Sequence, residues 1–314
     1  MTQPAYYFRY TLESAGPLNA LSTRRRHEGA LLRLGDGFGC IHPWPELGDH
    51  PLDEQLRLLQ QGRTTSLTRQ SLACCAADGT ARQQRRSLFD GLTIPPSHAT
   101  LVAFPSVSRC ARLAEEGFAS LKIKASAEDR DLPARLDQLA TELDSLGLGI
   151  RLRLDFNATL TANATLDFLW SLNKSARQHL EFLEDPCPYH PAAWTALRRM
   201  GRIPLALDRC TGEPEQETFD VRIIKPAVQE MAAHGGRILA TSYMDHPLGQ
   251  MFAAWQAALH FEHCDACGLL THSLFQPNPF SENLCVSGPV LHAPGGTGLG
   301  FDDLLEHLPW QRLN

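Results

Sequence analysis

The sequence contains no apolar run long enough to cross a lipid bilayer. Its first residues also lack the basic and then apolar pattern of a secretory signal peptide. Both absences argue against a membrane protein and against export. We therefore expect a cytoplasmic protein that has no membrane partner.

A surplus of positive charge is missing as well. The chain has 29 Lys and Arg against 35 Asp and Glu, so its formal net charge is −6. A protein that binds nucleic acid needs cationic side chains to neutralise the phosphate backbone. We therefore expect no nucleic-acid partner.

The cysteines show no disulfide framework. There are nine of them, an odd number, scattered through a chain large enough to fold without covalent links. They are interpreted as reduced thiols. Cys264 and Cys267 have zinc-ligand spacing and lie close to His260 and His263, but no second pair follows at a suitable distance. Packing at a helix end is the favoured interpretation of that group.

The remaining composition is that of a folded globular protein, with 43% hydrophobic and 20% charged residues in 314. Residues 1–96 carry strand-like and then helical patterns and are predicted to form an α+β capping domain. Residues 97–285 alternate short apolar strands with amphipathic helices. Residues 286–314 return to turn chemistry and are predicted to pack back on the cap.

Eight apolar segments in the central region are predicted to be strands. Their number favours a closed α/β barrel over an open doubly wound sheet, and no Gly-x-Gly-x-x-Gly turn follows any of them. The expected strands are 100–104, 120–124, 150–155, 180–184, 205–208, 221–225, 237–242 and 268–272.

Charged residues end five successive predicted strands. In a barrel these ends converge on one face, where barrel enzymes hold their active sites. Three carboxylates at such a face would repel one another unless a cation lay among them, and a hard divalent ion such as Mg²⁺ suits oxygen ligands. The five residues are Lys124, Asp155, Glu184, Asp208 and Lys225.

The two lysines in this set suggest the reaction type. A lysine near a divalent cation and a second ammonium has its neutral form favoured, as a general base requires near neutral pH. Together with a carboxylate-held metal, such a base suits removal of a proton next to a carboxylate. A single strand-end carboxylate is more often a helix cap or a surface ion pair, but five in register are hard to explain that way.

The motifs around these residues resemble the enolase superfamily, and specifically its muconate-lactonizing subgroup. The matching elements are the Lys-x-Lys of 122–124, the Asp-x-Asn of 155–157, the Glu-Asp-Pro of 184–186, the strand ending at Asp208 and the Lys-Pro of 225–226. The resemblance implies a modified TIM barrel, (β/α)₇β, with an α+β N-terminal capping domain completed by the C-terminal segment.

The resemblance also implies roles for individual residues. Lys124 would remove the proton α to the substrate carboxylate and then assist departure of a hydroxyl, and Lys225 would stabilise the enolate from the opposite face. Asp155, Glu184 and Asp208 would bind Mg²⁺. Lys122, Asn157 and Ser242 are the expected substrate-binding residues, and Lys122 would also lower the pKa of Lys124.

The short chain, the Lys-Pro of 225–226, the seventh-strand segment 238–242 and the eighth-strand segment 268–271 are most similar to the o-succinylbenzoate synthase family. This implies a lyase that dehydrates 2-succinyl-6-hydroxy-2,4-cyclohexadiene-1-carboxylate, a small-molecule carboxylate, to 2-succinylbenzoate in menaquinone biosynthesis. A dipeptide epimerase or N-acylamino acid racemase would use the same machinery and is the alternative. A barrel kept only for binding ranks below both, since no ligand or base is missing.

Two positions depart from the family pattern. Arg209 follows Asp208 where an acidic residue is usual, and 244–246 replaces a Glu-Ser pair. The sequence assigns no role to either, and it does not indicate the oligomeric state.

Overall fold

Two compact units make up the computed structural model of the chain, which describes residues 4–16, 18, 23–210, 214–231, 236–264 and 266–313. Unit 1 consists of Met1–Pro96, Ile224–Ala232 and Ala240–Asn314, and unit 2 of Ser97–Ile223 and Ala233–Leu239.

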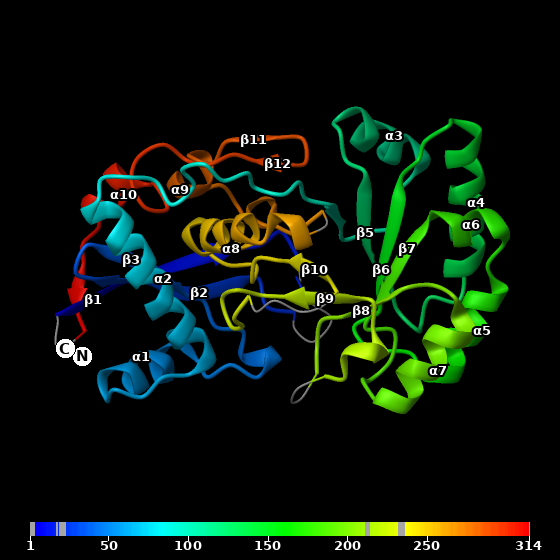
Figure 1. The fold of residues 1–314 in the computed structure, drawn as a ribbon, viewed down its shortest axis with the longest axis horizontal. Coiled ribbons are helices and arrows are strands. Elements are labelled where there is room, and N and C mark those ends of the chain that lie inside the picture. Colours follow the sequence, from blue (N-terminus) through cyan, green and yellow to red (C-terminus); the bar gives the residue numbers. More distant parts are fainter. Residues whose placement is uncertain are drawn as a thin grey trace. The chain divides into compact units, whose positions relative to one another are not determined.

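Unit 2 is built around parallel strands that alternate with helices (Figure 1). The sheet has the strand order β10-β9-β8-β7-β6-β5-β4, and neighbouring strands from β4 to β9 pair in parallel. Its strands are β4 (Ala99–Leu101), β5 (Ser120–Lys124), β6 (Arg151–Asp155), β7 (Leu180–Glu184), β8 (Leu205–Leu207), β9 (Val221–Ile224) and β10 (Arg237–Ala240). Its helices are α3 (Val107–Glu115), α4 (Leu132–Ser145), α5 (Ala162–Ser171), α6 (Lys174–His179) and α7 (Pro191–Gly201), with a 3₁₀ turn at Gln216–Thr218.

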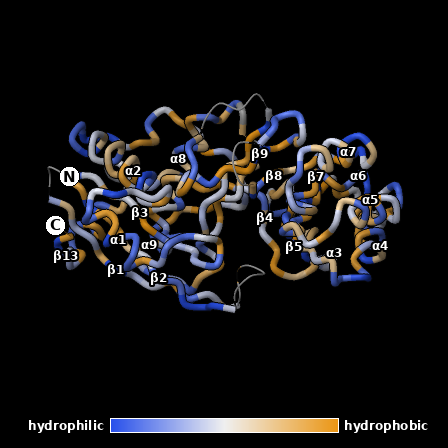
Figure 2. The backbone as a smooth tube through the Cα atoms, turned by 90° about the horizontal axis from the view of Figure 1, so that it is seen from below, coloured by the Kyte–Doolittle hydropathy of each residue, from blue (hydrophilic) through white to orange (hydrophobic). Residues whose placement is uncertain are grey.

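The helices of unit 2 form because their apolar residues recur at helical spacing. In α4 the buried residues include Leu132, Leu136, Leu139 and Leu143, which share one face of the helix. Side chains cap the starts of α3, α5 and α6; at α5, for example, the Thr161 hydroxyl accepts the Ala164 N–H. In Figure 2 these helices accordingly carry both hydrophobic and hydrophilic stretches. Their apolar faces therefore cover the buried strands, of which β7 is buried at every residue.

Unit 1 contains a four-stranded antiparallel sheet with the order β13-β1-β2-β3. One edge strand of this sheet, β13, comes from the C-terminal part of the chain. Its Arg312 pairs with Tyr6 of β1, and the Leu313 N–H donates to the Ala5 carbonyl over 2.8 Å. The elements of the sheet are β1 (Ala5–Glu13), β2 (Arg26–Leu34), β3 (Gly37–Ile41) and β13 (Gln311–Arg312). The others are α1 (Leu52–Gln60), α2 (Ser66–Gln83), α8 (Pro247–Leu259), α9 (Pro279–Glu282), β11 (Val286–Ser287), β12 (Val290–Leu291), α10 (Asp302–Glu306) and 3₁₀ turns at Pro45–Leu47, Phe261–His263 and His272–Leu274.

The core of unit 1 joins residues far apart in the sequence. Trp44 is fully buried, and its indole N–H donates to the Tyr243 carbonyl over 2.7 Å. Buried Asp78 accepts the backbone N–H groups of Phe38 and Leu299. Because one carboxylate satisfies two distant backbone donors, the N-terminal and C-terminal segments are held in one core.

The eighth expected strand is the main correction. Residues 268–272 form no strand: Gly268 makes an isolated bridge to Thr241, and a 3₁₀ turn begins at His272. The Leu274 N–H bonds to the Thr271 carbonyl, so the backbone turns on itself before a ladder can extend. An apolar run of this length is compatible with either outcome, which is why the sequence pattern misled.

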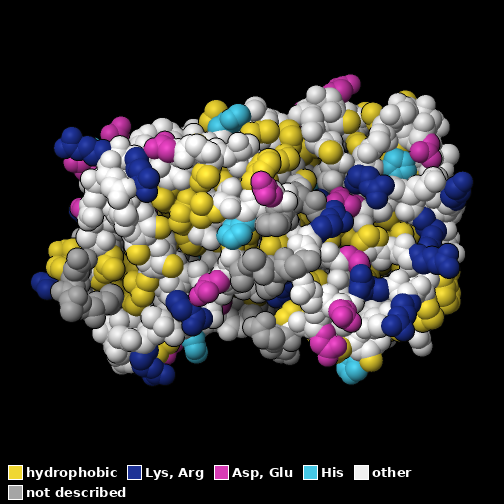
Figure 3. Space-filling view, viewed as in Figure 1, with side chains coloured by type: hydrophobic (Ala, Val, Ile, Leu, Met, Phe, Trp, Pro, Cys, Tyr) yellow, Lys and Arg dark blue, Asp and Glu magenta, His cyan; other side chains and the backbone are white. Residues whose placement is uncertain are grey.

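The surface carries both signs of charge. Lys and Arg are interspersed with Asp and Glu over the face shown in Figure 3. No helix among the described residues is long and apolar enough to cross a membrane. None of the nine cysteines, all within the described ranges, forms a disulfide.

Candidate active site

Three of the five predicted strand-end residues lie side by side on adjacent strands of unit 2. In the sheet register Lys124 of β5 is opposite Asp155 of β6, which is opposite Glu184 of β7. Asp208 directly follows β8, the next strand. The carboxyl edge of this sheet therefore gathers one lysine and three carboxylates, as the spacing predicts.

The lysines contact the carboxylates directly. Lys122 Nζ lies 2.9 Å from Asp155 Oδ2 and 2.7 Å from the Glu184 carboxylate. Lys124 Nζ donates to Asp155 Oδ2 over 2.5 Å and lies 3.3 Å from Asn157 Oδ1. We call the group of Lys122, Lys124, Asp155, Glu184, Asp185 and Asp208 the carboxyl-end cluster.

Burial and crowding shift the pKa values in this cluster. Burial, reinforced by the charges of Asp155 and Asp208 and opposed by Lys122, raises the pKa of Glu184 to about 7. Burial also opposes ionisation of Asp155, but Lys122 and Lys124 outweigh it and hold its pKa below the usual range. The pKa of Lys122 is raised, because its neighbouring carboxylates outweigh its burial. The cluster thus contains more carboxylate than its two lysines balance.

This surplus fits a divalent cation. Asp155, Glu184 and Asp208 offer oxygen ligands, which hard cations such as Mg²⁺ prefer. In the described ranges no three His, Cys, Asp or Glu side chains are already arranged as a metal site. The reason is visible in the contacts, since the Lys122 ammonium lies between Asp155 and Glu184. A cation held by both Asp155 and Glu184 would compete with Lys122 for their oxygens.

Asp185 is a residue whose role the sequence did not reveal. Its backbone is left-handed, with φ of 40°. Its buried carboxylate accepts the Asp208 N–H over 3.0 Å and the Arg209 N–H over 3.1 Å. It therefore fixes the backbone that carries Asp208. The consecutive acidic residues at the end of β7 were the available signal for such a role.

Two predicted site residues belong to unit 1. Lys225 directly follows β9, and its backbone N–H donates to Gln229 Oε1 over 3.0 Å. Ser242 is buried, its N–H donates to the Gly268 carbonyl over 3.1 Å, and its hydroxyl contacts that of Thr271. Their participation in the site remains a prediction.

A second ionic group lies nearer the amino ends of the same strands. Arg153 forms a two-pronged pair with Glu181, with distances of 2.8 and 2.9 Å. Glu181 also accepts from Ser120 over 2.8 Å and from Arg237 over 3.0 Å. Arg153 further bonds His98 Nδ1 over 2.9 Å. We call these five residues the amino-end cluster.

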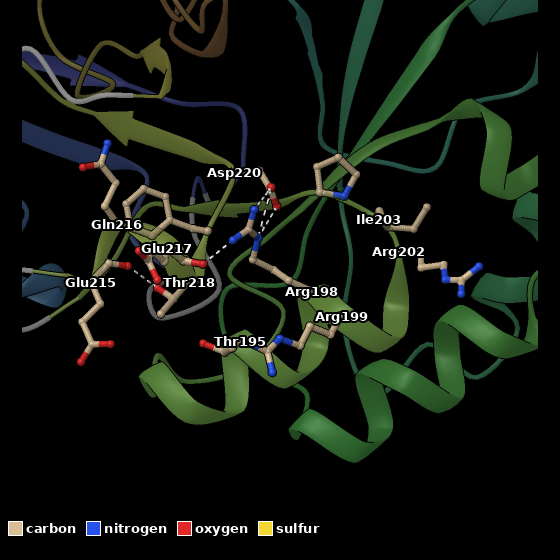
Figure 4. Close-up of a pocket in the computed structure, with 12 residues that line it drawn as sticks. Thr195, Arg198, Arg199, Arg202, Ile203, Glu215, Gln216, Glu217, Thr218 and Asp220 are labelled. Carbon is tan, nitrogen blue, oxygen red and sulfur yellow. Dashed lines mark hydrogen bonds and ion pairs between the residues drawn. The ribbon is translucent and has the colours of Figure 1, made fainter.

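A cavity of about 840 Å³ also lies at the amino ends of the strands, around residues 195–204 and 215–220 (Figure 4). Its most engaged side chain is Arg198, which pairs with both carboxylate oxygens of Asp220, while Arg202 is turned away from them. The cavity contains none of the carboxyl-end residues. It is therefore not the candidate active site.

Two parts of the chain match models of known protein families. Residues 5–81 match the family model "O-succinylbenzoate synthase, N-terminal domain", and residues 106–218 match "Enolase C-terminal domain-like". An o-succinylbenzoate synthase from Bdellovibrio bacteriovorus is 35% identical over 98% of each chain.

Solved structures show a similar fold. An enolase superfamily member from Roseovarius nubinhibens, complexed with magnesium, has a TM-score of 0.75 at 17% identity and covers 99% of this chain and 98% of its own. A dipeptide epimerase from Enterococcus faecalis, complexed with Mg and a dipeptide, has a TM-score of 0.74 at 16% identity, covering 95% and 98%. The predicted fold, a barrel with an N-terminal cap, is therefore confirmed.

Proposed function

The chain belongs to the o-succinylbenzoate synthase family of the enolase superfamily, and from that premise we propose that it dehydrates 2-succinyl-6-hydroxy-2,4-cyclohexadiene-1-carboxylate to 2-succinylbenzoate, with Mg²⁺, in menaquinone biosynthesis. Membership makes it an enzyme of the lyase class that acts on a small-molecule carboxylate. The exact substrate and the pathway are the proposed part.

Lys124 is assigned the proton transfers. Its neutral amine takes the proton from the carbon that bears the ring carboxylate, and the resulting ammonium returns a proton to the hydroxyl that leaves as water. One C–H and one C–O bond break, and the ring becomes aromatic. Lys122 and Lys124 contact the same carboxylate oxygen of Asp155, Oδ2, so the two amines lie beside one another at the proposed site.

Asp155, Glu184 and Asp208 would hold the Mg²⁺. When bound, the ion would supply positive charge to the substrate carboxylate, where negative charge develops as the proton departs. Lys225 is proposed to add charge from the opposite face of the substrate. Asn157, 3.3 Å from Lys124 Nζ through its Oδ1, keeps that amine oriented. Lys122 and Ser242 remain proposed substrate contacts.

One observation carries the proposal. Adjacent strands present Lys124, Asp155 and Glu184 in register, and burial with crowding raises the pKa of Glu184 to about 7. This group has more carboxylate than its two lysines balance, which leaves a place for a divalent cation beside Lys124.

The test follows the ultraviolet absorbance of the cyclohexadiene substrate mixed with the protein, with Mg²⁺ and with excess chelator. We expect rapid loss of the diene absorbance that depends on the metal. No loss from folded, Mg²⁺-loaded protein would contradict the dehydratase and favour an epimerase or racemase of the same superfamily, which a dipeptide panel would reveal.

The proposal places the enzyme in the cytoplasm. All nine cysteines are free thiols, as expected in a reducing compartment.

A further inference from the structure

We propose that Arg209 binds the second carboxylate of a dicarboxylate substrate, at the carboxyl edge of the unit 2 sheet. This inference rests on the proposed function, because it assigns a residue to the part of the substrate that does not react. It concerns a residue to which neither the motifs nor the mechanism gives a role.

The backbone of Arg209 is fixed in place. Its N–H donates to the Asp185 carboxylate, whose Oδ2 lies 3.1 Å away and whose Oδ1 lies 3.5 Å away. The same carboxylate holds the N–H of Asp208. The start of the Arg209 side chain is therefore held beside the proposed metal ligand, which prepares it for a binding role.

The guanidinium itself is only loosely held. Its Nε lies 3.8 Å from Asp208 Oδ2, beyond hydrogen-bond distance, and the side chain is 37% exposed. A guanidinium offers five N–H donors in a planar fork that matches a carboxylate. Among the described residues its ion-pair partner is Asp208, at a distance too long for a hydrogen bond, and a ligand carboxylate would offer this fork a closer partner.

The other cations of the unit 2 site are already engaged. Lys122 is 12% exposed and lies between Asp155 and Glu184. Lys124 is held by Asp155 and is the proposed base. Arg153 is buried and paired with Glu181. Arg209, by contrast, reaches a carboxylate within the described part of the chain only at the 3.8 Å contact with Asp208.

The charge of the proposed substrate requires such a partner. A succinyl-cyclohexadiene carboxylate carries two carboxylates, and the proposed metal and lysines serve the one beside the reacting carbon. A remote carboxylate buried without a cation would lose its hydration without compensation. Arg209 supplies that cation from a fixed position next to Asp208.

The experiment compares Arg209→Gln and Arg209→Lys with Arg199→Gln as the matched control. Arg199 is an exposed arginine on α7, at the cavity near the amino ends of the strands. Steady-state kinetics on the cyclohexadiene substrate give kcat and KM, and calorimetry on the folded proteins gives the Mg²⁺ affinity and the affinities for 2-succinylbenzoate and for benzoate.

For Arg209→Gln we expect KM and the Kd of 2-succinylbenzoate to rise about 10- to 100-fold, the effect of losing a charge-assisted hydrogen bond. The affinity for benzoate should not change, because benzoate lacks the second carboxylate. Mg²⁺ should bind no more weakly, because a cation beside Asp208 has been removed. Arg209→Lys should recover part of the loss, and Arg199→Gln should match the wild type.

Three results would overturn the inference. An unchanged KM in Arg209→Gln would show that Arg209 does not touch the substrate. An equal loss for benzoate, or a loss of Mg²⁺ affinity that accounts for the change in KM, would show that Arg209 supports Asp208 structurally. If the wild type neither turns over the diene nor binds 2-succinylbenzoate, the proposed function fails and takes this inference with it.

Discussion

The two ionic clusters of unit 2 share one sheet but are built in opposite ways. In the amino-end cluster Arg153, Arg237 and Ser120 all donate to one carboxylate, Glu181. In the carboxyl-end cluster Lys122 and Lys124 face several carboxylates, and the pKa of Glu184 is raised to about 7 by burial and like charge. The first cluster is complete and the second needs another cation.

This difference teaches how to separate a structural from a functional ionic group. Buried polar groups that serve only the fold find partners for all their atoms. Burial and repulsion can raise the pKa of a carboxyl group, and such a group destabilises the fold. Proteins retain this destabilisation at sites where function needs it. The following predictions test whether the two clusters separate in this way.

The largest effect is expected from Lys124→Ala. Removing the proposed base should lower kcat by about 10³-fold or more, because no other group within the described site is assigned the proton transfer. The fold and Mg²⁺ binding should persist, since the carboxylates remain. Diene kinetics, circular dichroism and calorimetry measure the three properties. Turnover near the wild-type rate would remove Lys124 from the mechanism.

The next effect contrasts the clusters directly through Glu181→Gln and Glu184→Gln. Without metal, Glu181→Gln should lower the free energy of unfolding by about 3–5 kcal/mol, because it leaves the buried Arg153 unpaired. Glu184→Gln should cost no more than about 1 kcal/mol, because it also removes like-charge repulsion with Asp155.

Urea unfolding measures both values, and activity per folded molecule is the second readout. Glu184→Gln should lose turnover while Glu181→Gln largely keeps it. Equal destabilisation by the two variants would mean that the clusters do not differ in kind.

The smallest expected effect is the contribution of Glu181 to the pH dependence of the unfolding free energy. Burial opposes ionisation of Glu181, but its hydrogen bond to Arg153 outweighs this and lowers its folded-state pKa below the usual 4.5. Its stabilising contribution is therefore fully present above pH 4.5 and is lost as the pH falls through the lower folded-state value. Urea titrations between pH 3 and pH 6 should show a shallower pH dependence of the unfolding free energy for Glu181→Gln than for the wild type. If the unfolding free energies of the variant and the wild type changed equally with pH, the Arg153–Glu181 ion pair would not lower the pKa of Glu181.

The sequence by itself identified the residues at the strand ends. Each of three predicted strands ends in a charged residue: Lys124, Asp155 or Glu184. Parallel strands connected by helices have their carboxyl ends along one edge of the sheet, so these residues are predicted to lie on adjacent strands. The chain's motifs were sufficient for the family as well, since motif residues are local in sequence.

Only the tertiary structure decided which side chains touch. Lys122 reaches Glu184 across 62 positions of sequence, and Asp185 reaches the backbone of Arg209 across 24. Neither contact follows from spacing, because it depends on strand register and on the left-handed turn at Asp185. The turn at residues 271–274 likewise ended the expected eighth strand. A hydrophobic pattern is set by residues that are close in the sequence. The charge balance of a site depends on residues that are distant in the sequence and are brought together by the fold.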